Sequence, residues 1–424
     1  MLKKILSRDN MYPPIELYES ISKKEIYNSW ETYLNDGLDN RVGLYIHIPF
    51  CKTKCEFCHC NSYVSNESEI KRYLDNLKEE ILFFSSLFKN KTISSIYFGG
   101  GTPSVLNVIQ LEDILKFIYD KFNFIDNVPF CFEAMPETLD FEKIDILSKY
   151  GVTRLSLGIQ TLDEKVLKNI NRIQNLENLL KNVNYIKKKI KYINVDLVCG
   201  LEGETLNTFI KGLEIVLNIS PDIIHIYRFN PSETTNFFKI GKIYTDENSK
   251  ISELMYQYAI KRIYETGRVK LKNDDYGYDI SARNISIVDR IENASSNIGF
   301  GYTARSNIFG KLAYVNSGVI IGNKINLDSY IGYNYLINDE KDRYVLQNMI
   351  EGLSFEKYKT IFKTDFLKDY GIKLKLLTSK YGKESILLSN SELKINFDKI
   401  NNFIFNSLFF GKDVINKLKE KYGN

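Results

Sequence analysis

The sequence predicts an α/β protein: a partial (β/α)6 barrel with an N-terminal arm and a small C-terminal helical domain resembling a winged helix. Between residues 42 and 229, six runs rich in β-branched and aromatic residues alternate with amphipathic helical patterns. Such alternation forms βαβ units with parallel strands. The predicted strands are VGLYIHI (42–48), SIYF (95–98), FCFEA (130–134), RLSLGI (154–159), INVDLV (193–198) and IIHIYRF (223–229).

Changes of pattern along the chain predict four segments. The chain has 424 residues, which is long enough for a barrel-sized unit and a second domain. We expect a helix over 250–266, irregular structure over the Gly-, Asn- and Ser-rich stretch 270–340, and then helices, a hairpin (384–396) and a last helix. The segments are an arm and helix (1–41), the barrel core (42–235), a barrel extension with substrate-side loops (236–342) and a C-terminal α+β domain (343–424).

Composition excludes several classes of function. The apolar fraction is 44% and the charged fraction 26%, as in ordinary globular proteins. A net charge of +4 is too small to indicate a nucleic-acid partner. The N-terminus, MLKKILSRDN, has no apolar signal region, and no run is long enough for a membrane span. We therefore expect a cytoplasmic protein with reduced thiols.

Four of the six cysteines are crowded into residues 51–60. Cys51, Cys55 and Cys58 have the spacing C-x3-C-x2-C, and Cys60 follows. Structural zinc sites usually pair two C-x2-C clips, and no second clip exists here. Three thiolates on one loop suit a [4Fe–4S] cluster with one iron left open. Clusters that only transfer electrons usually have four cysteine ligands, so an open iron indicates that a substrate or cofactor binds there. Zinc and a purely structural group of buried thiols are the alternatives.

The cysteine motif and the segment that follows it resemble those of a known family. YIHIPFC-x3-C-x-F-C-x-C followed by FGGGTPS is similar to the radical S-adenosylmethionine (SAM) superfamily, and more narrowly to the oxygen-independent coproporphyrinogen III dehydrogenases and their relatives. The resemblance is specific over residues 42–235. It implies that SAM binds the open iron and is cleaved, on reduction, to methionine and a 5′-deoxyadenosyl radical, which abstracts hydrogen from a substrate.

The glycine motif after the second strand predicts a ligand site. Three glycines allow close approach of a ligand to backbone groups, although a tight turn is the plainer reading. No Lys-Ser or Lys-Thr follows, which excludes a P-loop. The resemblance implies that Gly99, Gly100 and Gly101 hold the SAM amino group, that Thr102 lines the adjoining pocket, that Glu133 holds the ribose and that Tyr45 lies beside SAM.

A second set of residues matches the family's second SAM site. Asp196 lies in an apolar strand, where a carboxylate needs a partner such as Arg172, or a ligand. The resemblance implies that Phe57, Gln160, Arg172 and Asp196 bind a second SAM. Most of these motifs lie at the carboxyl ends of the predicted strands, the face on which barrel active sites are built.

Two arginines depart from the family pattern. By alignment, Arg228 and Arg305 replace small or apolar residues that line the SAM sites. They are either surface residues or groups at the barrel mouth that bind an anionic substrate, or a second SAM held differently. His47 and His59 receive no role, and Cys131 and Cys199 are expected to be buried small apolar residues.

The resemblance leaves three functions open. The first is a radical enzyme acting on a tetrapyrrole, by oxidative decarboxylation of coproporphyrinogen III or a similar step. The second is a two-SAM radical methyltransferase, and the third is a haem-binding chaperone. Cys60 favours the first over the chaperone, whose His-Asn-x-x-Tyr-type motif is missing, while the arm is reduced to MYPP (11–14). The expected partners are an anionic small molecule and an electron donor such as flavodoxin or ferredoxin, and the protein is expected to be a monomer.

Overall fold

The computed structural model describes almost the whole chain. The described residues are 1–8, 12–36, 41–232, 235–272, 274–321, 324–389 and 391–423. Met11, the first residue of the MYPP segment, lies outside them.

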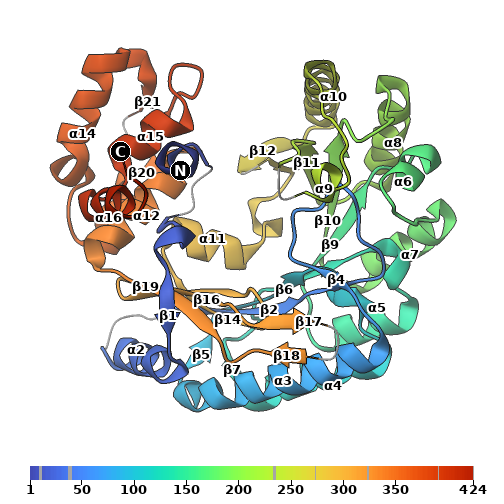
Figure 1. Cartoon of the computed structure of the whole chain (residues 1–424). Coiled ribbons are helices and arrows are strands. Elements are labelled where there is room, and N and C mark those ends of the chain that lie inside the picture. Colours follow the sequence, from blue (N-terminus) through green and yellow to red (C-terminus); the bar gives the residue numbers. More distant parts are fainter. Residues whose placement is uncertain are drawn as a thin grey trace.

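A row of six parallel strands forms the centre of the fold (Figure 1). All six predicted strands are confirmed, and neighbours along the chain pair in parallel. The second strand continues beyond its predicted end into the glycine motif, to Gly100. The strands are β2 (Val42–Ile48), β6 (Ser95–Gly100), β8 (Phe130–Ala134), β9 (Arg154–Gln160), β10 (Tyr192–Cys199) and β11 (Ile223–Arg228).

Helices cover the outer face of these strands (Figure 1). In α3, Asn66 and Glu69 form a capping box at the start, and the buried residues recur at helical spacing. Their burial joins the outer helices to the sheet in one large core. The helices are α3 (Glu67–Ser85), α4 (Val108–Lys121), α5 (Phe141–Lys149), α6 (Glu164–Asn169), α7 (Leu176–Lys189), α8 (Leu206–Ile219), α9 (Asn236–Lys239) and α10 (Asp246–Glu265).

The expectation of irregular structure over residues 270–340 is wrong. Short strands there extend both edges of the six-stranded row, because β14 pairs with β2 and β13 pairs with β11. Together with one strand of the N-terminal arm they make a sheet of thirteen strands, while β17 and β18 form a separate two-stranded sheet. Such strands are stabilised by pairing with a sheet edge that already exists, so their own sequence carries little signal. The elements are β12 (Val269–Lys272), β13 (Asp275–Gly277), α11 (Ile285–Glu292), β14 (Ser296–Phe300), β15 (Arg305–Ile308), β16 (Leu312–Asn316), β17 (Val319–Ile321), β18 (Lys324–Asn326) and β19 (Tyr330–Asn334).

The N-terminal arm joins two cores. α2 (Lys23–Asn35) packs Trp30 into the barrel core, where its indole N–H donates to the Tyr314 hydroxyl at 2.8 Å. α1 (Leu2–Leu6) packs instead into a second core with the C-terminal helices, and Asn406 donates to the Leu6 carbonyl at 2.8 Å. β1 (Glu19–Ile21) lies between them at the sheet edge, paired with β19.

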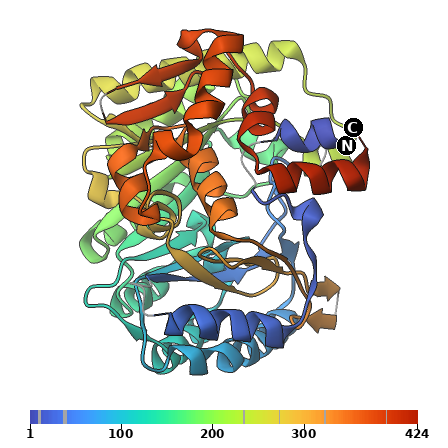
Figure 2. The same ribbon diagram turned by 90° about the vertical axis from the view of Figure 1, so that its left-hand side faces the viewer.

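The C-terminal segment forms an α+β unit that shares its apolar core with the N-terminal arm. It contains a three-stranded antiparallel sheet in the order β20, β22, β21. Figure 2 shows the two chain termini side by side on this unit. Its elements are α12 (Ile337–Asn348), β20 (Leu353–Ser354), α13 (Phe355–Phe362), α14 (Phe366–Tyr381), β21 (Ile386–Leu388), β22 (Glu392–Ile395), α15 (Asn402–Phe409) and α16 (Lys412–Tyr422).

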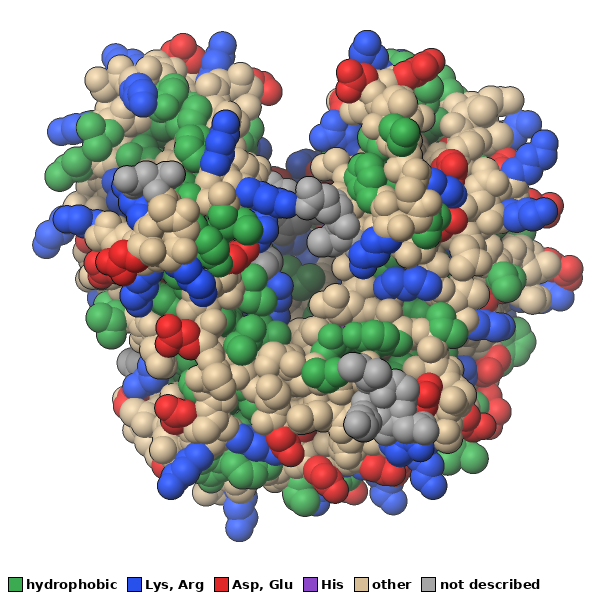
Figure 3. Space-filling view, in the orientation of Figure 1, with side chains coloured by type: hydrophobic (Ala, Val, Ile, Leu, Met, Phe, Trp, Pro, Cys, Tyr) green, Lys and Arg blue, Asp and Glu red, His purple; other side chains and the backbone are tan. Residues whose placement is uncertain are grey.

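A deep notch separates the C-terminal unit from the side of the molecule that carries α10. Figure 3 shows this notch open to solvent, with Lys and Arg side chains on both walls. α11 crosses its floor (Figure 1). The carboxyl ends of the central strands therefore face a space that is accessible from outside.

Candidate active site

The cysteine loop is held in place by its own hydrogen bonds and by the barrel. It follows the short strand β3 (Phe50–Cys51), which pairs with β4 (Tyr63–Val64). Lys54 donates to the Cys60 carbonyl and the Ser62 hydroxyl, both at 2.8 Å. The Glu56 N–H donates to the Ile170 carbonyl at 3.1 Å, which anchors the loop to the segment after β9.

The four thiols of the loop differ in burial and in acidity. Cys51 and Cys55 are buried, Cys58 is half-buried and Cys60 is exposed. Hydrogen bonding from Cys60, with Lys54 nearby, lowers the pKa of Cys58 to about 6, whereas burial raises the pKa of Cys55. The Cys60 N–H lies 3.3 Å from the Cys58 sulfur. Thus the Cys60 backbone supports Cys58 as a thiolate, which is the ligand form of cysteine.

The glycine motif brings backbone close to this loop. A Cβ atom added at Gly101 would lie 2.7 Å from the Phe50 carbonyl and 3.0 Å from the Cys51 sulfur. Gly100 has φ of +118°, a conformation that L side chains rarely adopt. Thr102 is buried, with its hydroxyl 3.5 Å from the Cys51 sulfur. Glycine is therefore required here by both packing and backbone conformation.

Glu133 projects from β8 toward the glycines. A Cβ atom at Gly99 would lie 3.1 Å from the Glu133 carboxylate and 3.2 Å from the Tyr45 ring. The Tyr97 hydroxyl donates to Glu133, and burial raises the pKa of this carboxyl to about 7. The Tyr45 hydroxyl lies 2.9 Å from His47 Nδ1. These side chains form the wall between the glycine motif and the barrel interior.

The sequence leaves open a partner such as Arg172, or a ligand, for Asp196, and in the structure Arg172 is not that partner. Arg172 Nη1 lies 3.7 Å from the Cys55 sulfur, and Nη2 donates to the Gly158 carbonyl. The Asp196 carboxylate accepts from Ser156 Oγ at 3.2 Å and Asn194 Nδ2 at 2.8 Å. Asp196 is only half-buried, so neutral donors suffice. The guanidinium instead lies beside the cysteine loop, because the segment after α6 packs against that loop.

Three cavities meet at Glu133, which lines all of them. The cluster cavity, of about 470 Å³, contains the three motif cysteines and most of the predicted site. The side cavity, of about 490 Å³, contains Tyr45 and Arg305. The polar chamber, of about 120 Å³, lies among β9, β10, β11 and β13. The predicted residues in the cluster cavity are Cys51, Cys55, Phe57, Cys58, Gly100, Gly101, Thr102, Glu133, Gln160, Arg172, Asp196 and Arg228.

The structure places the two unusual arginines in different cavities. Arg228 lines the cluster cavity, but it forms an ion pair with Glu253 and lies 5.5 Å from the Tyr256 ring centre. Arg305 lines the side cavity, on β15. Both arginines therefore line interior cavities, and the charge of Arg228 is balanced by Glu253.

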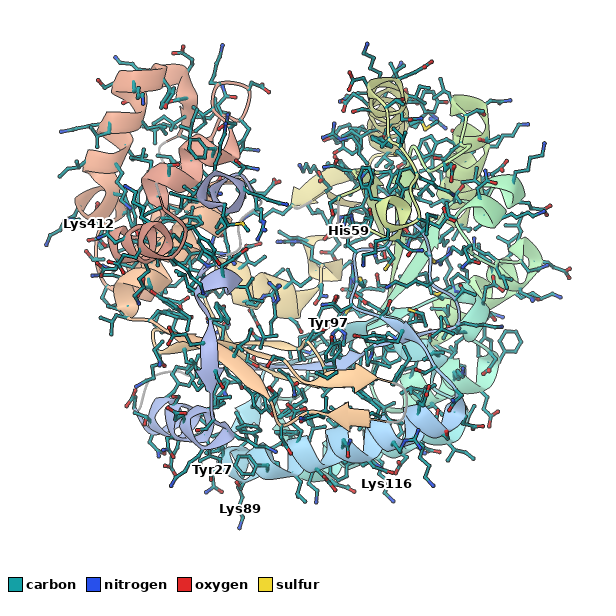
Figure 4. The ribbon with its side chains drawn as sticks, viewed as in Figure 1. Tyr27, His59, Lys89, Tyr97, Lys116 and Lys412 are labelled. Atoms are coloured by element: carbon teal, nitrogen blue, oxygen red, sulfur yellow. The ribbon has the colours of Figure 1, made fainter. Side chains whose placement is uncertain are left out.

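Several lining residues were missed by the sequence reading. His59 lines both larger cavities, and Figure 4 places it with Tyr97 near the centre of the molecule. Arg290 projects from α11 into the side cavity. His225 pairs with Asp275 at 2.9 Å in the polar chamber. His59 lies on a loop, Arg290 on a helix and His225 on a strand, and the tertiary packing that brings them to the barrel interior is not visible in the local pattern.

The cluster cavity fits an iron–sulfur cluster with a bound nucleoside. Its wall combines three cysteines, backbone that has room only for glycine, and a carboxylate suited to ribose hydroxyls. Within the described residues, no three His, Cys, Asp or Glu side chains are close enough to bind one metal ion. Cys131 and Cys199 are buried elsewhere, as expected, although Cys131 also accepts from Arg154 at 3.3 Å.

Comparison with known proteins shows similarity to radical SAM proteins. The model of the radical SAM superfamily matches residues 45–215. The haem chaperone HemW of Buchnera aphidicola subsp. Acyrthosiphon pisum is 29% identical over 377 residues, which cover 87% of this chain and 97% of that protein. The oxygen-independent coproporphyrinogen III oxidase of Helicobacter pylori (strain 26695) is 34% identical over 229 residues, which cover 52% of this chain and 50% of that protein.

A solved structure shows the same fold. Coproporphyrinogen III oxidase (HemN) from Escherichia coli superimposes with a TM-score of 0.77 at 21% identity, covering 96% of this chain and 98% of that one. The α/β radical SAM architecture predicted from the sequence is thereby confirmed. Among the described helices, none has the length and apolar content needed to cross a bilayer.

Proposed function

Because the chain carries a radical SAM domain and is similar to HemW and HemN proteins, we propose that it is a radical SAM enzyme acting on a carboxylated tetrapyrrole. The proposed reaction is oxidative decarboxylation of coproporphyrinogen III or a similar step. A radical SAM domain implies a [4Fe–4S] cluster and SAM, which together supply the radical that removes hydrogen from the substrate. The observation that carries the proposal is the cluster cavity, where the cysteine and glycine motifs and Glu133 share one wall.

The chain's own residues would hold these groups in distinct ways. Cys51, Cys55 and Cys58 would ligate the cluster, since all three line the cavity and Cys60 is exposed at its rim. Arg172 lies beside the Cys55 sulfur and would offset part of the negative charge of the thiolates. Glu133, once ionised, can accept two hydroxyl donors from a ribose.

One SAM is proposed for the glycine motif, and a second is proposed at Phe57, Gln160 and Asp196. These three residues line the same cavity, and Phe57 lies on the cysteine loop itself. Gln160 has φ of +69°, an unusual conformation for a residue other than glycine. Strain of this kind collects at ligand sites. The cavity's depth within the barrel would exclude water from the radical.

The route for electrons and the cellular setting are also proposals. An acidic one-electron carrier such as flavodoxin or ferredoxin would reduce the cluster. All six cysteines are free of disulfides, which is consistent with a reducing cytoplasm. We propose a monomer that acts on a small molecule.

Haem binding is the second candidate, supported by the nearly full-length similarity to a protein named HemW. The chain has three histidines. His47 and His225 are engaged with Tyr45 and Asp275. His59, whose Nδ1 lies 3.4 Å from the Ser232 hydroxyl, lines both larger cavities and is the candidate haem ligand. Titration of the protein with haem, using His59→Ala as the matched variant, tests this candidate directly.

The test of the proposed function is anaerobic reconstitution followed by product analysis. With dithionite and SAM, the protein should form 5′-deoxyadenosine, and coproporphyrinogen III should increase its yield and lose carboxyl groups as CO2. Transfer of a methyl group to the substrate with release of S-adenosylhomocysteine would identify the two-SAM methyltransferase instead. Absence of 5′-deoxyadenosine under all reducing conditions would reject both enzyme assignments.

A further inference from the structure

The side cavity is a distinct compartment next to the cluster cavity. Its walls include residues along β2 and β6, the start of strand β14, helix α11 and Arg305 of β15. It shares His59, Cys60, Gly100 and Glu133 with the cluster cavity. A molecule in the side cavity would therefore reach the cluster cavity across Glu133 and the glycine motif.

The side cavity is rich in polar atoms that have no partner. Within the described residues, four buried side-chain atoms of its wall form no hydrogen bond: His47 Nε2, Ser95 Oγ, Ser286 Oγ and Arg290 Nε. Each of these atoms can act as a donor when His47 accepts from Tyr45 at Nδ1. Buried polar groups in native proteins are normally satisfied, so this set indicates a ligand or ordered water.

Arg290 also carries charge that no carboxylate balances. It forms no ion pair in the described part of the chain, whereas Arg343 pairs with Glu340 and Arg283 pairs with Glu292. Burial, together with the charges of Arg343 and Arg305, lowers the pKa of Arg290. The surroundings of Arg290 are thus unfavourable for a cation unless an anion enters the cavity.

The carboxylates in the wall of the side cavity, Asp289 and Glu133, do not pair with Arg290. Asp289 points its carboxylate to Asn293 Nδ2, at 2.8 Å, and Glu133 accepts from Tyr97. Burial raises the pKa of both carboxyls, and that of Glu133 reaches about 7, so the charge of Glu133 is reduced near neutral pH. A guanidinium binds a carboxylate through two parallel hydrogen bonds, and this geometry gains strength where water is excluded.

We propose that the side cavity binds a carboxylate group of the substrate, with Arg290 as its main anchor and Arg305 as a second cationic contact. Ser95, Ser286 and neutral His47 supply further donors. The proposal rests on the proposed function and names the chemistry at one end of its substrate. A second SAM, whose net charge is +1, fits the acidic wall of Asp196 better than these two guanidiniums.

Binding of a porphyrin probe tests the proposal without relying on turnover. Reconstituted protein is titrated with coproporphyrin III, which has four carboxylates, and with its tetraamide, which has the same frame without charge. Fluorescence reports the dissociation constants. We expect Arg290→Gln to weaken coproporphyrin binding about tenfold to a hundredfold and to leave tetraamide binding unchanged, because a hydrogen bond to a charged group is lost.

Two further variants separate charge, geometry and folding. Arg290→Lys keeps the charge but not the planar pair of donors, so its affinity should lie between those of Arg290→Gln and the native protein. Arg262→Gln removes an arginine that pairs with Glu214 on the outer face of α10, and it should bind the probe as the native protein does. Arg305→Gln should weaken binding less than Arg290→Gln.

The outcomes distinguish this proposal from the proposed function. Equal affinity for both probes, no binding of coproporphyrin III, or native-like binding by Arg290→Gln would overturn the carboxylate site even if 5′-deoxyadenosine is formed. Iron content and SAM cleavage, measured on the same samples, test the radical enzyme separately. If iron binding and SAM cleavage are absent while the probe still binds in an Arg290-dependent way, the enzyme assignment is wrong and the carboxylate site is supported.

Discussion

Replacing Gly100 by alanine tests whether the glycine motif is shaped for a ligand. Gly100 ends β6 with φ of +118°, and its added Cβ would lie 2.8 Å from His47 Nε2 and 2.9 Å from the Ile48 carbonyl. The Ile48 carbonyl is backbone of β2, the neighbouring strand, and cannot move without disturbing the sheet. The strain must therefore be relieved by shifting the end of β6 itself.

The free-energy cost of Gly100→Ala is the sum of two contributions. A residue other than glycine in this part of the Ramachandran map costs about 1–3 kcal/mol. Forcing a methyl group into a packed site costs about 1–3 kcal/mol more. The sum, about 2–6 kcal/mol, corresponds to at least tenfold weaker SAM binding if it appears at the site, since about 1.4 kcal/mol is a factor of ten. If this cost appears in folding, the melting temperature should fall by roughly 2 °C or more.

The assay combines equilibrium binding of SAM, iron content and thermal melting on one preparation. Gly371→Ala is the matched control, because it lies within α14 and its added Cβ would meet no atom within 4 Å. That control should be unchanged or more stable by about 0.5–1 kcal/mol. Native-like SAM affinity and native-like melting in Gly100→Ala would refute the reasoning, since the structure offers the methyl group no free space.

Other predictions concern the cluster loop and Glu133. Changing any one cysteine of the C-x3-C-x2-C motif to alanine should abolish iron binding, whereas Cys60→Ala and the control Cys199→Ala should keep it, as iron analysis and EPR would report. Burial raises the pKa of Glu133 from 4.5 to about 7, so the folded protein holds this proton more tightly and loses stability as pH rises between those values. Glu133→Gln avoids that loss. In denaturant titrations, the free energy of unfolding of the variant minus that of the native apoprotein should therefore increase by up to about 3 kcal/mol between pH 5 and pH 8. Arg172→Gln should shift the cluster's reduction potential to more negative values, because a positive charge near the Cys55 sulfur is removed; an unchanged potential would exclude that role.

The sequence was sufficient for the central fold because its signals there are local. Strands buried on both faces read as continuous apolar runs, and this is why β2 and β9 were predicted almost to the residue. The strands after β13 were missed for the opposite reason. Leu312–Asn316, for example, is fully buried only because β15 and β19 pair with it on either side. Pairing partners distant in sequence leave no trace in a short window.

The same distinction decides which residues of the site could be predicted from the sequence. The cysteine and glycine motifs are contiguous, so both could be read directly. The partner of Arg172 could not be read from the sequence, because the distance between Arg172 and Asp196 depends on how the segment after α6 packs against the cysteine loop. Arg290 had no motif at all. It lies on a short helix whose position is fixed by contacts with the barrel and with α12.

The partners of the charged groups distinguish the two larger cavities that Glu133 joins. Asp196, Glu133 and Arg172 line the cluster cavity, where Arg172 lies beside the Cys55 sulfur and Arg228 is paired with Glu253. In the side cavity, Arg290 forms no ion pair with any described residue, and its Nε atom forms no hydrogen bond. A cationic cofactor and an anionic substrate would thus be held on opposite sides of one carboxylate. Glu133 would lie between them, where its ionisation near neutral pH affects both.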